Sequence, residues 1–405
     1  MPNKQQVQYF SIFLTNPNSG FTDQLLHFSA FYKLGLSLGY KYIHTPLKSR
    51  RSSSKVYEFL GFNDCFLIKI NKILWFQYKF IDIEFNDEIL QISGVQTVLE
   101  LQEFVKKTIL ERSDSFNCNK KIVIRFKLVP GVARRIFRLI HSCIQDFSDG
   151  LSLRSVYFSK NGNIRRSKFL SDKIKILVHI RQGDTAAIET PWQTFIPLRG
   201  ENRLVELKQK PSSIQIKGRS YSIFDIEDYY DFIKKLTSYF GEDRFSSIIS
   251  SDGYHRAFET IYKNIERLNL SPGQVKSLKR AAVHYDSKKF ALFEDIKDSI
   301  SIIGENDENL YDLIHSSLTA DIIIMGTQQT MIPKLLANYY DIKKRPIILS
   351  LYKTKEPPNY ESEFSLTAEK ATVIHHKLDE YNFDDLAIQL EKEITNRSPK
   401  FCQPR

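Results

Sequence analysis

Short apolar runs recur along the chain, separated by stretches with helical spacing of apolar positions. Residues 9–14 form one such run, and residues 174–180 form another that is apolar at most positions. Runs of this length without alternation are typical of strands buried on both faces of a parallel sheet. Because helical periodicity follows after a turn, the pattern predicts strand–helix units and an α/β fold.

The first half of the chain predicts a strand, a glycine turn and a helix. The helix is expected over residues 21–38, and a second strand over residues 40–43, before Pro46. Further on, helix and strand signals alternate over residues 89–92, 95–105 and 122–128, and an amphipathic helix is expected over residues 132–147.

The second half has a clearer alternation of elements. Asp225, with Asp228 in the first turn, favours the start of a helix over residues 225–239. Further helices are expected over residues 254–268, 310–318 and 331–340, and strands over residues 245–249, 322–325 and 346–351. Residues 191–222 show weak periodicity and predict a long excursion over the surface between two regular elements.

A change of composition between residues 159 and 171 marks the expected domain boundary, because polar and basic residues interrupt the apolar pattern there. We expect an α/β domain over residues 1–165 and a Rossmann-like domain over residues 166–405, with the last helix either on its own domain or packed back on the first. In doubly wound sheets ligands bind at the carboxyl ends of the strands, so function is expected in strand-to-helix loops.

The charge and the cysteines narrow the class of protein. Fifty-eight lysines and arginines against 47 acidic residues give a net charge of +11, which attracts nucleic acid, anionic lipid or a diphosphate, or serves solubility alone. The four cysteines form neither a CxxC motif nor a disulfide framework. With no apolar stretch long enough for a signal peptide or a membrane span, we expect a cytoplasmic protein without stable membrane insertion.

The loop after the apolar run at 174–180 carries unusual chemistry. It contains His179, Arg181, Asp184 and Glu189. A guanidinium donates two hydrogen bonds at once and stays charged, which suits a diphosphate that gathers charge as it leaves. The alternative interpretation is an ion pair between Arg181 and Asp184 that caps the next element.

This loop, His-Ile-Arg-Gln-Gly-Asp, resembles the His-x-Arg-x-[Gly/Thr]-Asp motif of the α1,2-, α1,6- and protein O-fucosyltransferase superfamily. The resemblance implies a GT-B-like fold, with two Rossmann-like αβα domains facing across a cleft, a GDP-fucose donor and no metal or other cofactor. It implies that Arg181 contacts the β-phosphate and that His179, Gly183 and Asp184 lie near the nucleotide. Glu189, eight residues after the arginine, stands where the α1,6 branch has its catalytic base.

A second block, Gly20-Phe21-Thr22-Asp23-Gln24, resembles the Gly-[Leu/Phe]-x-Asn-Gln turn of the same superfamily. Gly20 and Phe21 would let the donor approach the backbone at a helix amino terminus. Asp23 replaces the usual asparagine and cannot donate a hydrogen bond when ionised. It therefore has three open roles: a contact to the acceptor hydroxyl, an alternative base, or a simple helix cap.

Later blocks complete the resemblance. Asp252 follows a predicted strand, as in the superfamily's strand that ends in Ser/Thr-Asp, and either binds ribose or base or caps a helix. Asp312 stands near the superfamily's nucleotide-contacting aspartate. Hydroxyls and amides that would donate to phosphate come from Thr327, Gln328, Gln329 and Thr330.

The sequence thus predicts an inverting, metal-independent glycosyltransferase that moves fucose from GDP-fucose to a hydroxyl of a glycan or protein. Three alternatives stay open: a GT-B-like transferase for another nucleotide sugar, an inactive family member that only binds, and a basic nucleic-acid-binding protein. We favour the transferase, and we therefore expect its partners to be a nucleotide-sugar donor and a glycan or protein acceptor. We do not expect nucleic acid as a partner. No metal-ligand spacing is recognised among His141, His284, His375 and His376.

Overall fold

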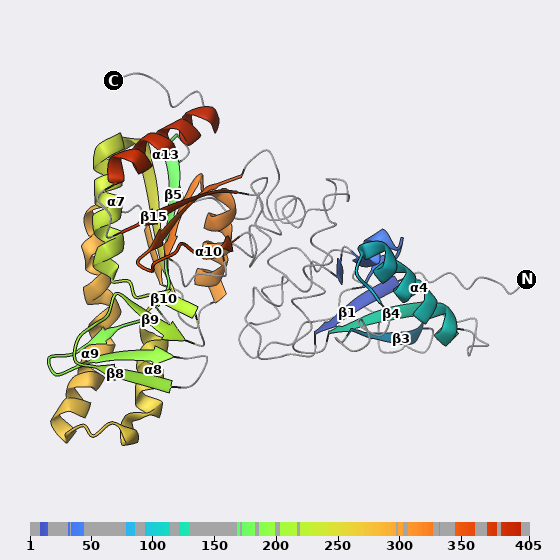
Figure 1. Ribbon diagram of the computed structural model, residues 1–405, viewed down its shortest axis with the longest axis horizontal. Helices are drawn as coiled ribbons and strands as arrows, with labels where there is room; N and C mark the ends of the chain where they lie inside the picture. The colour runs from blue at the N-terminus through green and yellow to red at the C-terminus, as the bar shows by residue number, and fades with distance from the viewer. Residues whose placement is uncertain are drawn as a thin grey trace, which may run out of the picture. The chain divides into compact units, whose positions relative to one another are not determined.

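The computed structural model describes residues 9–14, 31–43 apart from 33, 78–85, 94–113, 121–128 and, with gaps, 168–397, and the statements below concern these residues (Figure 1). The chain divides into two compact units. The first consists of Met1–Arg166 with two short later segments, Pro333–Asp341 and Glu361–Leu366, and the second of the rest.

The first unit contains a four-stranded parallel sheet in the order β2-β1-β4-β3. Its elements are β1 (Tyr9–Leu14), β2 (Lys41–Tyr42), β3 (Tyr78–Phe85), α4 (Val98–Ser113) and β4 (Lys121–Leu128). Aromatic rings fill its core, because Phe10, Phe31 and Phe85 are buried and each contacts the buried ring of Phe126. The strand predicted over residues 9–14 is confirmed at both ends.

Helix α4 settles the mixed signals over residues 95–105 in favour of a helix. Thr97 and Glu100 form reciprocal bonds at its start, since the Glu100 N–H donates to Thr97 Oγ1 at 3.2 Å and the Thr97 N–H to Glu100 Oε2 at 2.8 Å. This capping box satisfies backbone donors that the first turn of a helix leaves unpaired, which fixes where the helix begins.

The second unit is built on a six-stranded, entirely parallel sheet. Its strands are β5 (Ile174–Ile180), β11 (Phe245–Ser251), β12 (Ser299–Ile302), β13 (Ile322–Gly326), β14 (Ile347–Tyr352) and β15 (Thr372–Lys377). The spatial order is β12-β11-β5-β13-β14-β15. Counted in chain order within this sheet, that is 3-2-1-4-5-6, the strand order of a Rossmann fold, and the order reverses between β5 and β13.

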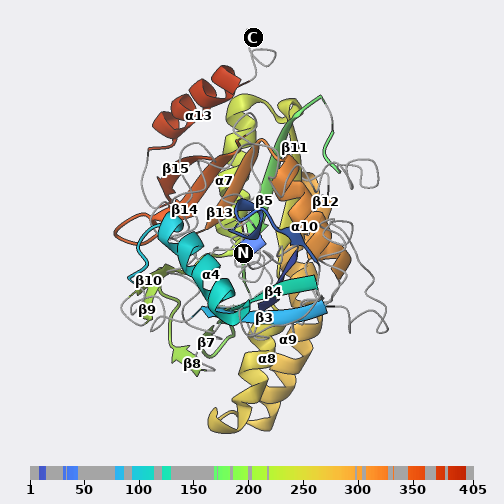
Figure 2. The ribbon, with the colours of Figure 1, turned by 90° about the vertical axis from the view of Figure 1, so that its right-hand side faces the viewer.

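Helices cover both faces of this sheet. They are α7 (Ile226–Phe240), α8 (His255–Lys263), α9 (Pro272–Phe290), α10 (Asp307–Thr319) and α13 (Phe383–Arg397), with 3₁₀ turns at Glu242–Arg244, Ile265–Arg267 and Ala291–Asp295. The even-numbered side chains of β5 share one core cluster with α7, α8 and α13. Figures 1 and 2 show α10 on the opposite face from α7. Helix α13 therefore buries its apolar side within its own unit.

Two small antiparallel sheets lie between β5 and α7 in the chain. One contains β6 (Ile188–Glu189), β7 (Thr194–Leu198) and β8 (Arg203–Leu207), and the other is the hairpin of β9 (Ser213–Ile216) and β10 (Arg219–Ser222). They occupy the stretch in which the sequence predicts a weakly periodic excursion. Helix α8 packs against β7 and β8.

The sequence predicts most strands and helices of the large parallel sheet correctly but misses several elements of the second unit. Strand β5 is confirmed at both ends, and α7 begins after its predicted N-cap Asp225. The single helix expected over residues 254–268 is divided into α8 and a 3₁₀ turn. Helix α9, strands β12 and β15 and the five short strands β6–β10 were not predicted. The helices expected over residues 132–147 and 331–340 and the segment 89–92 lie outside the described residues, apart from Ile332, as does most of 21–38.

None of the helices within the described ranges is long and apolar enough to cross a bilayer.

Candidate functional site

The candidate site lies where the strand order of the six-stranded sheet reverses. Strands β5 and β13 are direct neighbours, with His179 opposite Met325. The segments that follow them leave the sheet toward different strands, so their carboxyl ends flank the position where doubly wound sheets bind ligands. Arg181 follows β5 immediately, and Gly326 ends β13, just before the Thr327–Thr330 segment that the sequence singles out.

His179 is the buried imidazole of this edge. Its side chain is 3% exposed, and its Nδ1 lies 3.3 Å from the carbonyl oxygen of Ser250 on β11, so Nδ1 is the protonated nitrogen of a neutral ring. Burial, with a smaller contribution from the nearby Arg181 charge, lowers the pKa of His179 to about 3. The imidazole is therefore uncharged at neutral pH, and Arg181 supplies the positive charge at this end of β5.

Asp252 joins the two loops on this side of the site. Its Oδ1 accepts a hydrogen bond of 2.6 Å from the backbone N–H of Gln182. Gly253, at a φ of +67°, follows in a conformation that favours glycine, and its N–H donates to Ser251 Oγ at 3.0 Å. The structure thus gives Asp252 a structural role between β5 and β11, whether or not it also contacts a nucleotide.

Two buried polar atoms at the same end of the sheet have no hydrogen-bond partner. They are Nε2 of Gln182 and Oγ of Ser250, on side chains that are 2% and 0% exposed. An unpaired buried donor is costly, which makes such atoms uncommon outside sites that receive a ligand or water. Neither residue was predicted as part of the site, although Gln182 lies within the motif and Ser250 directly follows a predicted strand.

Gly326 allows α7 to approach the end of β13. A Cβ atom there would lie 2.7 Å from Cε2 of Phe224 and closer still to the hydroxyl of Tyr229. Tyr229 is fully buried, and burial raises the pKa of its hydroxyl. The backbone before the Thr327–Thr330 segment is therefore fixed by two aromatic rings that leave no room for a side chain.

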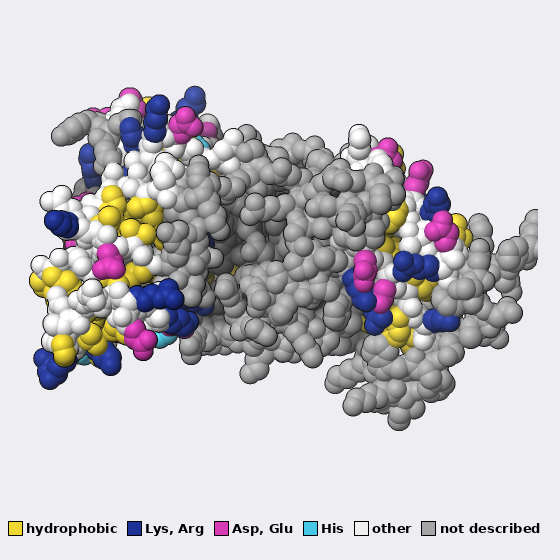
Figure 3. All heavy atoms as spheres, turned by 60° about the horizontal axis from the view of Figure 1, so that its bottom comes forward, with side chains coloured by type: hydrophobic (Ala, Val, Ile, Leu, Met, Phe, Trp, Pro, Cys, Tyr) yellow, Lys and Arg dark blue, Asp and Glu magenta, His cyan; other side chains and the backbone are white. Residues whose placement is uncertain are grey.

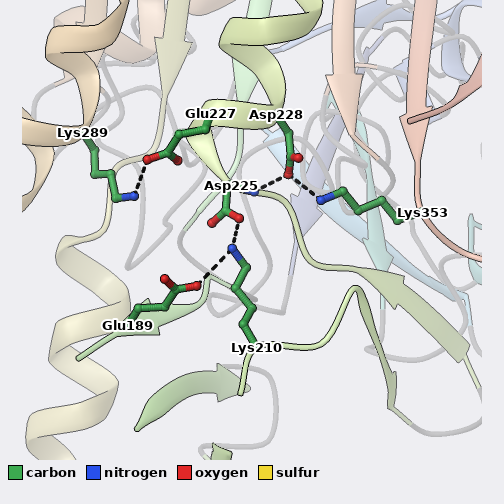
Figure 4. A network of polar contacts seen from close by, with 7 residues as sticks. All are labelled: Glu189, Lys210, Asp225, Glu227, Asp228, Lys289 and Lys353. Atoms are coloured by element: carbon green, nitrogen blue, oxygen red, sulfur yellow. Dashed lines mark hydrogen bonds and ion pairs between the residues drawn. The ribbon is translucent and has the colours of Figure 1, made fainter. Parts of the chain in front are cut away.

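Glu189 ends the short strand β6 and contacts Lys210 from the segment between β8 and β9 (Figure 4). Lys210 Nζ lies 3.3 Å from Glu189 Oε1 and is also ion-paired with Asp225, the N-cap of α7. Burial lowers the pKa of Lys210, and Glu189 offsets part of that effect. The Glu189 side chain is 54% exposed, so one lysine fixes a carboxylate that solvent and a substrate can still reach.

Lys210 belongs to a larger network at the amino end of α7 (Figure 4). Asp228 Oδ2 accepts from the Asp225 N–H at 2.7 Å and from Lys353 Nζ at 2.6 Å, after β14. Glu227 pairs with Lys289 of α9 at 2.7 Å. Acidic side chains in the first turn stabilise the helix, and here, together with the N-cap, they also bind lysines from three other segments of the chain.

Asp312 has a partner other than a nucleotide. It lies on α10 and accepts a hydrogen bond from Lys168 Nζ at 2.6 Å, with a side chain that is 22% exposed. The pair connects α10 to the segment that leads into β5, so the predicted nucleotide contact at Asp312 stays a prediction.

Several predicted site residues lie outside the described part of the chain. They are Gly20, Phe21, Asp23, Gly183, Asp184, Thr327, Gln328, Gln329 and Thr330. Of the predicted residues that the structure describes, His179, Arg181 and Asp252 come together at the ends of β5 and β11. Glu189 lies in the lysine network and Asp312 on α10.

Across the described ranges no three histidine, cysteine, aspartate or glutamate side chains are grouped to hold a metal ion. Metal independence stays a prediction.

Comparison with known proteins shows a remote structural likeness. No family model matches the chain, and no curated protein matches it. Among solved structures, a point mutant of Arabidopsis thaliana FUT1 in complex with GDP is similar at a TM-score of 0.31 and 8% sequence identity, over 89% of this chain and 74% of that one.

Proposed function

We propose that this protein is an inverting, metal-independent glycosyltransferase that transfers fucose from GDP-fucose to a hydroxyl of a glycan or protein. One observation carries the proposal: the Rossmann strand order of the second unit puts Arg181 at the point where that order reverses. The sequence resemblance adds that the first unit is the acceptor side of a GT-B-like pair.

Arg181 would hold the β-phosphate of the donor. As the bond between the sugar C1 and the diphosphate oxygen breaks, negative charge collects on the leaving group, and a guanidinium placed there stabilises that charge more than the ground state. His179 would contribute an uncharged hydrogen-bonding ring, because its pKa of about 3 keeps it neutral. The unpaired amide of Gln182 adds a buried donor in the same loop.

A carboxylate would complete the reaction as general base. The acceptor oxygen attacks C1 from the face opposite the diphosphate, and its proton passes to the base while GDP leaves. Glu189 is half exposed and fixed by Lys210, which suits that role. Asp23 is the alternative base.

The test is transfer and donor hydrolysis with a panel of nucleotide sugars, using wild type, Arg181→Ala and Arg181→Lys. We expect activity with GDP-fucose, a loss of about 10²-fold or more in Arg181→Ala because charge-assisted bonds contribute about 1.5–3 kcal/mol each, and partial recovery in Arg181→Lys. Arg267→Ala, at an exposed arginine in the 3₁₀ turn after α8, is the matched control and should keep full activity.

The outcomes separate the parts of the proposal. Activity with a uridine nucleotide sugar alone would refute GDP-fucose as donor and keep a transferase. Wild-type activity in Arg181→Ala would refute the site itself.

A further inference from the structure

The inward face of helix α9 packs and forms hydrogen bonds within the second unit. Ser271 and Gln274 form a capping box at its start, with the Ser271 N–H donating to Gln274 Oε1 at 2.8 Å. Leu278 is buried, and the ring of Tyr285 packs edge-on against Tyr254. Asp286, the one acidic residue of the helix, points inward, where it accepts a bond of 2.9 Å from the Tyr254 N–H.

The outward face of α9 carries several basic side chains and no acidic one. Lys276, Arg280, His284 and Lys288 follow one another at intervals of four residues, with Lys279 beside them, and all five side chains are exposed. Within the described part of the chain, none of the five has an ion-pair partner, whereas Lys289, which faces α7, is paired with Glu227. The outward face therefore carries its charge into solvent.

This arrangement costs helix stability. Like charges four residues apart on a helix, such as Lys276 and Arg280, destabilise it by about as much as an opposite pair stabilises it. Residues 255–290, which contain α8 and α9, hold eight lysines and arginines against three acidic residues, a net +5 of the whole chain's +11. The basic side chains on the outward face of α9 reduce the stability of that helix. Because an anionic partner would neutralise their repulsion, they indicate a surface that binds one.

An apolar residue lies in the middle of this basic face. Val283, between Arg280 and His284 in the sequence, is 74% exposed. Helix geometry places it on the line from Lys276 to Ser287, with the cations on both sides. A row of cations around an exposed apolar side chain suits the headgroup layer of an anionic membrane, where lysines meet lipid charges and the apolar group enters the interface.

We propose that the outward face of α9 docks the protein on an anionic lipid surface, as a peripheral contact without insertion of a helix. Figures 1 and 2 show α8 and α9 extending together past the small antiparallel sheet, and Figure 3 shows lysine and arginine side chains exposed at this end of the second unit. The other polyanion to consider is nucleic acid. Single strands are bound with stacking aromatics, and the aromatic ring of α9 that could serve, Tyr285, is turned inward.

The experiment is co-sedimentation of the full chain with vesicles of phosphatidylcholine alone and of phosphatidylcholine with phosphatidylserine. We expect binding only to the anionic vesicles, with an affinity that falls as salt rises. The double variant Lys276→Ala/Arg280→Ala should bind about 25-fold more weakly, since each cation near a charged membrane contributes about fivefold, equivalent to about 1 kcal/mol. Val283→Ser should weaken binding without changing the salt dependence.

The control is Lys106→Ala/Lys107→Ala, which removes the same charge from exposed positions of α4 and should bind as wild type does. Equal weakening in both double variants would show a net-charge effect and overturn the proposal. Absence of binding to anionic vesicles would also overturn it, and so would binding of single- or double-stranded nucleic acid that α9 substitutions abolish while vesicle binding persists. None of these outcomes depends on a sugar donor, so the proposed transferase activity stands or falls separately.

Discussion

Gln182 and Asp252 connect two loops that are 70 residues apart in the sequence, through a 2.6 Å hydrogen bond from the backbone N–H of Gln182 to Oδ1 of Asp252. The strands that precede these loops are neighbours in the sheet, with His179 opposite Ser250. A carboxylate that accepts from a backbone N–H is a strong contact. Because Gln182 directly follows Arg181, this bond fixes the backbone that carries the guanidinium.

We predict that Asp252→Ala destabilises the protein and weakens donor binding together. It leaves the Gln182 N–H without its acceptor, at a cost of about 1–3 kcal/mol in the free energy of unfolding. Asp252→Asn keeps a side-chain oxygen in place and should recover most of the stability. Urea unfolding and a thermal-shift titration with GDP measure the two effects. Asp243→Ala, at an exposed position before β11, should change neither, and a stable Asp252→Ala would show that the bond contributes little.

Gly326→Ala is predicted to be among the more damaging small substitutions in the second unit. The added methyl group would overlap Phe224 and Tyr229, and overpacking of this kind costs about 1–3 kcal/mol in the free energy of unfolding. Removing the hydroxyl in Tyr229→Phe makes room on one side, so the double variant should recover part of the loss. A double-mutant cycle by chemical denaturation gives the coupling between the two positions.

Gly273→Ala provides the comparison. A Cβ there would meet nothing closer than Ser271 Oγ, at 3.9 Å, and the residue lies within α9. Alanine is the better helix former, so this substitution should be neutral or slightly stabilising. If the two glycine variants unfold alike, the packing against Tyr229 and Phe224 is looser than the structure indicates.

The sequence could predict those parts of the fold that depend on local pattern. Strand β5 is apolar at nearly every position because both of its faces are covered, and its two ends are predicted without error. Asp225 and Asp228 predict the start of α7 because they form its cap themselves: the Asp225 N–H donates to the Asp228 side chain. Helix α9 was missed because its inward face has few large apolar residues, and only Leu278 and Phe290 are fully buried.

The sequence could predict the site residues that a local pattern marks at the end of a strand, such as Asp252 after β11. His179 and Arg181 lie two residues apart, and the fold keeps them together at the end of β5. Lys210 is 21 residues from Glu189, and their contact depends on how the small antiparallel sheets fold back on α7, which no local pattern specifies. The unpaired atoms of Gln182 and Ser250 are equally a property of packing.

His179 predicts how stability depends on pH. Its pKa is about 3 in the folded protein against about 6.5 in an unfolded chain, so between these values the unfolded state binds the extra proton. Stability from this group is therefore complete above pH 6.5 and is lost as the pH falls toward 3, by about 2 kcal/mol at pH 5 relative to pH 7.5. His179→Asn should flatten this part of the pH dependence of unfolding, and the exposed His284→Gln should not. An unchanged slope in His179→Asn would mean that the ring is not held neutral.

The lysine network permits a comparison between two partly buried lysines, of which only one contacts Glu189. Lys210 and Lys353 are 14% and 12% exposed, and each pairs with an aspartate at the start of α7. Lys210 alone of the two contacts Glu189. Both Lys210→Met and Lys353→Met should lower the free energy of unfolding by about 1 kcal/mol, since the carboxylates left behind are partly exposed and regain water.

Only Lys210→Met should lower kcat for sugar transfer, by about tenfold or more, because it releases the carboxylate proposed as the base. The KM for the donor should stay the same, because the proposal assigns donor binding to Arg181. Lys210→Arg should recover part of kcat by restoring the ion pair. Equal kcat values in Lys210→Met and Lys353→Met would show that Glu189 is not the base, and Asp23 would then be the candidate for that role. A loss of kcat in both variants, in proportion to their loss of stability, would show that the network supports the fold and not the chemistry.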